Sequence, residues 1–276
     1  MQALPHPHIP LQASDGSVLR ARAMQEYLLS LREVLSGYAL IPPVHLLVLS
    51  EADWKTRIKH PYGFPFQRTS LKDGLYLFLP ARYPERFVWR LRETLVPAIK
   101  RAGRPPGQPG DFLDLNLGHE YAHAVAVAWK LRTRTKWVDE FVANYLYLFA
   151  LHQALPELYP KARLWGILLA HLVPSEPSLG SYETKPKGLS DQLWFQGQFT
   201  TEAARLVEEK GDLLLQGLLQ AAPLSKKSVH KVLMGLEPDL RDWFASFAPS
   251  KERSRIDRDG RSGWDALGFE ANSAAK

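Results

Sequence analysis

The segment GHEYAH, at residues 118–123, places two histidines four positions apart, with a glutamate directly after the first. The surrounding residues favour a helix, on which side chains four positions apart share a face with Cβ atoms about 5–6 Å apart. His119 and His123 are therefore expected to bind one metal ion. Glu120 would lie beside that ion, where its carboxylate can take a proton from a metal-activated water. The spacing predicts a zinc site with a general base next to it.

A third zinc ligand must come from another part of the chain, because a catalytic zinc ion commonly has three protein ligands and one open position. The sequence contains no cysteine, which leaves histidine and carboxylate as the strong ligands. Glu140 is the best candidate, since it lies in the next predicted helix, after the polar run 132–136. The adjacent Asp139 is the alternative ligand. A further alternative is that both acids only stabilise the N-terminus of that helix.

Asn144 lies one helical turn after Glu140, on the same predicted face. Its side-chain carbonyl is expected to accept the free N–H of a ligating histidine and so fix the tautomer of that ring. Two helices joined by a short loop are expected to lie antiparallel, so that the two histidines would face Glu140.

The elements that must position these residues follow from the apolar patterning. Apolar residues at helical spacing predict a helix over 18–37, and short apolar runs bounded by prolines predict strands over 44–49 and 74–79, on either side of an aromatic loop at 60–66. Helical patterns then dominate, at 87–96, 111–131, 137–155, 161–172, 190–210, 213–219 and 228–247. The sequence predicts an α+β fold, with a small α/β N-terminal lobe containing a short mixed sheet and then a mostly helical lobe.

The expected organisation is one catalytic unit with three parts. Residues 1–110 form the α/β lobe, residues 111–249 form the helical lobe with the metal residues, and the charged, weakly apolar residues 250–276 form a mobile tail. The densest apolar stretches, 145–151 and 164–173, are too short to span a bilayer, and the N-terminus lacks the pattern of a signal peptide. We expect a cytoplasmic protein without a membrane partner.

The formal charge of +6 arises from basic residues that are mostly interleaved with acids. No motif for reading nucleic acid accompanies this charge, so nucleic acid is not the expected partner. A peptide or a protein is the expected substrate.

The arrangement resembles the gluzincins, the thermolysin-like clan of zinc metallopeptidases, and in particular their small single-domain bacterial members. The Tyr-Gly aromatic loop, the strand before Pro80 and the segment WFQG at 194–197 are similar in order to elements of that family. The resemblance implies a zincin-like fold, Glu120 as the base, Asn144 as a residue behind the metal, and three ligands, His119, His123 and Glu140. It also implies that the strand Gly74–Leu79 forms the sheet edge that pairs with an extended peptide.

The residue that stabilises the oxyanion is less clearly indicated. Trp194 stands where the family often has a tyrosine, and an indole cannot donate a phenolic hydrogen bond. Tyr182, in a glycine-bearing loop, is the first candidate for another donor, and His230 is the second. A surface position for both is the alternative.

Three functions are consistent with these residues. The first is zinc-dependent peptide-bond hydrolysis, in which Glu120 takes a proton from water and passes it to the departing amine. The second is a zinc-binding module that has lost turnover, which Trp194 motivates. The third is a DNA-linked regulator, which the basic balance motivates, although no recognition helix stands out.

Overall fold

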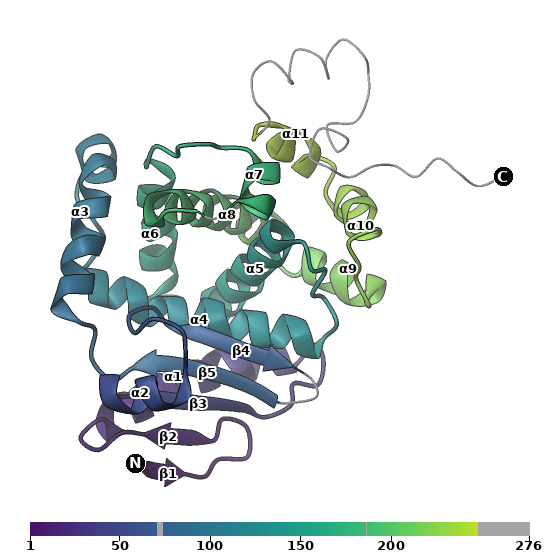
Figure 1. Cartoon of the computed structure of the whole chain (residues 1–276). Coiled ribbons are helices and arrows are strands. Elements are labelled where there is room, and N and C mark those ends of the chain that lie inside the picture. The colour runs from purple at the N-terminus through teal and green to yellow at the C-terminus, as the bar shows by residue number, and fades with distance from the viewer. Residues whose placement is uncertain (71–73, 186, 248–276) are drawn as a thin grey trace.

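A computed structural model describes residues 1–70, 74–185 and 187–247 (Figure 1). Strands occupy the first 80 residues together with two helices, and helices alone form the rest of the described chain. The predicted α+β class is therefore confirmed. The predicted tail, 250–276, lies outside the described residues. Each helix in the described part is too short or too polar to cross a membrane.

Five strands form one mixed sheet within the described residues, in the order β1-β2-β3-β5-β4. Their bounds are Gln2–Leu4, Leu11–Ala13, Val44–Leu49, Phe66–Ser70 and Gly74–Pro80 for β1 to β5. Strands β2, β3 and β5 are parallel, while β1 and β4 pair antiparallel at the two edges. The expectation that Gly74–Leu79 is the sheet edge is therefore wrong, because β5 is hydrogen-bonded on both sides. The edge strand next to it is β4.

Both faces of the central strands are covered, which explains their near-continuous apolar sequences. Successive residues of β3 alternate between the two faces. Leu46 and Val48 belong to the main core with residues of α1 (Val18–Ser36) and α4 (Pro109–Ala128). Leu47 and Leu49 pack instead with Trp54 of α2 (Glu51–Arg57).

Helix α5 (Lys136–Ala154) lies at the centre of the helical part (Figure 1). Helix α5 contacts α1, α4, α6, α7 and α8, and its sequence is apolar on nearly all sides, as expected for a buried helix. The others are α3 (Glu85–Ala102), α6 (Tyr159–Ala170), α7 (Leu179–Thr184), α8 (Leu189–Lys210), α9 (Leu213–Ala221), α10 (Val229–Leu236) and α11 (Leu240–Ala245).

One hydrophobic core runs from the sheet into the helical part. Helix α4 makes this connection, because it contacts β4 and β5 on one side and α5 on the other. The segment with His119 and His123 therefore lies on a helix that contacts both parts of the fold.

Two of the differences from the expected helices have a clear local cause. Helix α4 begins at Pro109, and Gln108 and Asp111 form a capping box, in which the Asp111 carboxylate accepts the Gln108 N–H at 3.2 Å. The segment predicted as one helix over 228–247 contains two, α10 and α11, separated at Glu237 and Pro238. The ring of Pro238 disfavours the helical conformation of the residue before it, Glu237, which accounts for the break.

Candidate metal centre

Helix α4 places His119 and His123 on one face, as their spacing predicts. The two rings are nearly perpendicular, at 85°, with centroids 4.6 Å apart. Their Nε2 atoms lie 3.1 Å from each other. His119 is buried, with a side chain 5% exposed, and the His123 side chain is 13% exposed. Both nitrogens therefore point to one small region.

Glu140 brings a carboxylate to the same region from α5. Its Oε2 atom lies 3.1 Å from His119 Nε2 and 3.4 Å from His123 Nε2. These three side chains form a group of potential metal ligands among the described residues. The predicted third ligand is thus placed beside the predicted first two.

The geometry of this group fits a shared cation. In a tetrahedral zinc site with bonds of about 2.0–2.1 Å, neighbouring ligand atoms are about 3.3–3.4 Å apart, close to the three distances here. Hydrogen bonds among the three atoms fit this arrangement less well than a cation does. A proton on one imidazole Nε2 can point at only one of its two neighbours. If both Nε2 atoms carry protons, the two N–H groups face each other at 3.1 Å. A single cation between the three atoms satisfies all of them.

The charges of the ligand group also suit a metal ion. Burial acts to raise the pKa of Glu140, but the two imidazoles, His123 foremost, hold the pKa of this carboxyl well below its usual range. Burial lowers the pKa of His119, which favours the neutral ring that a metal requires. Burial also acts to lower the pKa of His123, but Glu140 raises it to about 9, so metal binding at neutral pH would release a proton.

Asp139, the alternative ligand, has a different role. Its Oδ1 accepts hydrogen bonds from the backbone N–H and the hydroxyl of Thr133, at 2.7 and 2.8 Å. Its Oδ2 accepts the backbone N–H of Arg134 at 3.1 Å. Asp139 therefore anchors the loop between α4 and α5 and is not part of the ligand group.

Glu120 follows the first ligand on α4 and is partly buried. The backbone of Gln67, on the edge strand β4, lies near its carboxylate. Burial is the main cause that raises the pKa of Glu120 to about 7; the nearby His123 acts in the opposite direction, and Glu140 adds to the rise. A general base works best when its pKa lies near the operating pH, so this environment suits that role.

A cavity of about 330 Å³ opens at the candidate metal ligands His119 and Glu140. Its walls include His119, Glu120 and Glu140, together with aromatic side chains from the loop before β4, from β4 and from α4, namely Phe64, Phe66 and Phe112. We call it the active-site cavity because its walls include Glu120, the candidate general base. It has the size of a typical small-molecule or peptide side-chain site.

Tyr182 lines the active-site cavity from α7, a short helix where a loop was expected. Its ring packs on Phe195, with centroids 4.6 Å apart, and burial together with nearby Glu140 raises the pKa of the phenol. Trp194 packs on Phe195 and Phe247 and is not among the cavity residues. His230 lies on α10 and is also not among them. Of these three residues, only Tyr182 lines the same cavity as the candidate metal ligands His119 and Glu140.

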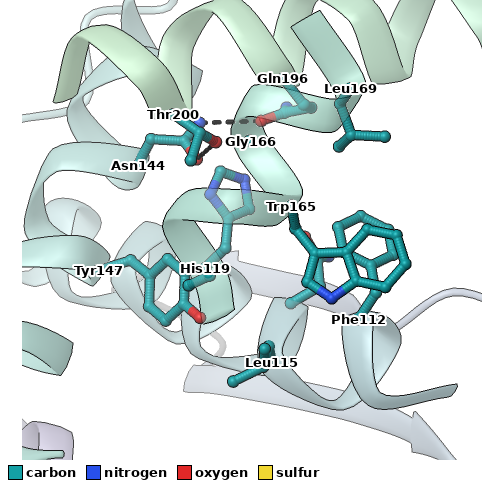
Figure 2. A pocket seen from close by; sticks show the side chains of 12 residues that line it. Phe112, Leu115, His119, Asn144, Tyr147, Trp165, Gly166, Leu169, Gln196 and Thr200 are labelled. Atoms are coloured by element: carbon teal, nitrogen blue, oxygen red, sulfur yellow. Dashed lines mark hydrogen bonds between the residues drawn. The ribbon is translucent and has the colours of Figure 1, made fainter. Parts of the chain in front are cut away.

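Asn144 is buried behind Glu140, but its contacts differ from those expected. Its side-chain carbonyl accepts the Thr200 hydroxyl at 2.9 Å, not the N–H of a ligating histidine. Its amide donates to the Glu140 backbone carbonyl at 3.0 Å. The same amide donates to Gln196 Oε1 at 2.8 Å (Figure 2).

Gln196 is the member of this network that touches a ligand. Its amide donates to Glu140 Oε2 at 2.6 Å, the same oxygen that faces both histidines. The hydrogen bonds therefore run in one direction, from Thr200 through Asn144 and Gln196 to Glu140. The sequence offered one signal for Gln196, a polar residue within the apolar helical segment WFQGQF at 194–199.

Comparison of the chain with protein-family models, with curated proteins and with solved structures finds no match.

Proposed function

We propose that this chain is a zinc-dependent peptidase. The observation that carries the proposal is the convergence of His119, His123 and Glu140 on one point, with the Glu120 carboxylate beside it in a cavity of about 330 Å³. Two neutral nitrogens and one carboxylate are a ligand set that catalytic zinc sites use. The same ligands and base occur in gluzincins, so we also propose that the chain is similar to that clan.

Zinc bound by these three side chains would supply a Lewis acid that polarises a carbonyl and acidifies water. Glu120 takes the proton of the attacking water and then delivers it to the amine that departs. Gln196 holds the Glu140 carboxylate in place through its hydrogen bond. Tyr182 donates its phenolic hydrogen to the oxygen on which negative charge develops, a role that its place in the active-site cavity supports.

An extended peptide is the substrate that fits the surroundings best. The edge strand β4 contacts α4, the helix that carries His119 and Glu120. The cavity walls formed by Phe64, Phe66 and Phe112 offer apolar surface for a side chain next to the cleaved bond. The side chains of peptides are held in such pockets while the main chain stays extended.

The competing proposal is a zinc-binding module without turnover. Its motivation was Trp194 in the position of an oxyanion donor, yet Trp194 packs against Phe195 and Phe247. Tyr182 is the residue that lines the cavity. This arrangement favours hydrolysis over the module without turnover.

Removal and return of the metal test the proposal. Protein treated with a chelator should lose hydrolysis of a library of quenched fluorescent peptides and should regain it when one equivalent of zinc is added. Binding of zinc without hydrolysis of any peptide would favour the module without turnover. Failure to bind zinc, cobalt or manganese would refute the metal centre itself.

A further inference from the structure

A second, smaller cavity of about 30 Å³ also touches His119 (Figure 2). We call it the inner cavity. Its walls come from α4, α5, α6 and α8, and Figure 2 shows the His119 ring between Tyr147, Trp165 and the pair formed by Asn144 and Thr200. The inner cavity shares Phe112, Asn116, His119 and Gln196 with the active-site cavity. Of the three candidate ligands, only His119 lines the inner cavity.

The Nδ1 atom of His119 is buried and has no hydrogen-bond partner among the residues that the structure describes. The whole residue is only 4% exposed. When Nε2 of a histidine binds a metal, its Nδ1 carries the proton, and ligating histidines almost always donate that N–H to an acceptor. The acceptor for His119 must therefore lie within reach of its buried Nδ1 atom.

The polar side chains nearby, Asn144, Gln196 and Thr200, are hydrogen-bonded to one another. The Thr200 hydroxyl donates to Asn144 Oδ1, and Gln196 Oε1 accepts from the Asn144 amide. The second lone pairs of these carbonyl oxygens can still accept a hydrogen from a small molecule in the inner cavity.

The size and polarity of the inner cavity match water. A buried water needs roughly 10–15 Å³ of such space and two to four polar partners. The walls contain the imidazole of His119, the amides of Asn116, Asn144 and Gln196, and the hydroxyl of Thr200. None of these walls carries a formal charge that would require an ion.

We propose that the inner cavity binds an ordered water, which accepts the Nδ1–H of His119 and donates to the amide oxygens of the wall. The water acts as the positioning partner that Asn144 was expected to be. It fixes the His119 tautomer with Nε2 free for the metal, and it links His119 to the network that holds Glu140. This inference rests on the proposed metal centre but not on peptidase activity.

The first test is a high-resolution crystal structure of the zinc-bound wild type. The expected result is a water at about 2.7–3.2 Å from His119 Nδ1. The ¹H–¹⁵N spectrum of histidine-labelled protein should show a His119 Nδ1–H that cross-relaxes with a bound water. A dry inner cavity, or a direct hydrogen bond from Nδ1 to a protein side chain, would overturn the proposal.

The second test fills the inner cavity. Ala162 lines it from α6, so Ala162→Val should expel the water and weaken zinc binding by about 10-fold to 100-fold, the usual effect of losing such a partner. Ala21→Val is the matched control, because Ala21 is buried on α1 and lines neither cavity. Zinc affinity is measured by competition with a chelating dye.

Each outcome decides the proposal. A folded Ala162→Val protein that lacks the water but binds zinc as tightly as the wild type would show that the water does not position His119. If Ala162→Val fails to fold, the wild-type crystal structure and spectrum decide alone. Loss of zinc binding in every protein, including the wild type, would instead refute the proposed metal centre.

Discussion

The side-chain amide of Gln196 donates a hydrogen bond of 2.6 Å to Glu140 Oε2, the oxygen that also lies 3.1 Å from His119 Nε2. This contact joins α8 to the ligand group on α4 and α5. Its direction is fixed, because Gln196 Oε1 is already the acceptor for Asn144. The carboxylate therefore keeps one orientation before any metal binds, which reduces the cost of organising the site.

The substitution Gln196→Ala should weaken zinc binding by about 10-fold to 100-fold, because Glu140 loses the donor that orients it. Gln198→Ala is the matched control on the same helix, since Gln198 contacts the Ala170 carbonyl and not a ligand. The measurement is zinc affinity by dye competition. Equal affinities for the two variants would show that the Gln196 contact does not organise the metal centre.

The substitution Asn144→Ala should keep the fold and also weaken zinc binding by about 10-fold to 100-fold. Asn144 acts through Gln196, so the double variant Asn144→Ala/Gln196→Ala should lose little more affinity than Gln196→Ala alone. A double-mutant cycle by dye competition measures this. Additive losses would contradict the chain of hydrogen bonds.

The substitution Tyr182→Phe should lower kcat by about 10²-fold to 10³-fold, the usual effect of losing one oxyanion donor. Zinc content and the melting temperature should stay unchanged, because the ring still packs on Phe195. Tyr38→Phe makes the same chemical change outside the active-site cavity and should leave kcat intact. His230→Ala should also retain turnover per folded molecule. Full turnover by Tyr182→Phe would remove Tyr182 from the mechanism.

The substitution Gly197→Ala should lower the free energy of unfolding by about 1–3 kcal/mol, as overpacking does. A Cβ atom at Gly197 would lie 2.6 Å from the Leu169 backbone carbon and would also meet the Ala170 nitrogen, where α8 crosses α6. Gly180→Ala is the control, since a Cβ there meets nothing within 4 Å. Urea unfolding compares the two, and equal stabilities would show that α6 and α8 can separate without loss.

Local rules were sufficient to predict which side chains form the candidate ligand group. The spacing of His119 and His123 fixes their shared face as soon as the segment is helical. The short loop before α5 then brings Glu140 opposite them. Both steps use residues close in sequence, which is why the ligand group was predictable as a set.

Contacts between distant residues were not predictable in the same way. Gln196 is 56 residues from Glu140, and its role depends on how α8 packs against α5. The place of β5 inside the sheet was missed for a different, local reason, because no strand was predicted over 66–70, where β4 forms and pairs with β5. The role of Asn144 was misjudged because Thr200, also 56 residues away, takes its carbonyl.

The comparison of wild type with Glu120→Gln tests the central claim most directly. Zinc content and hydrolysis of the quenched peptide library are measured on both proteins, with Glu157→Gln, an exposed site, as the matched control. The account predicts about one zinc per chain in all three proteins and hydrolysis by the wild type and Glu157→Gln only, because an amide cannot accept the proton from water. Equal hydrolysis by Glu120→Gln, or a wild type without bound metal, would contradict it.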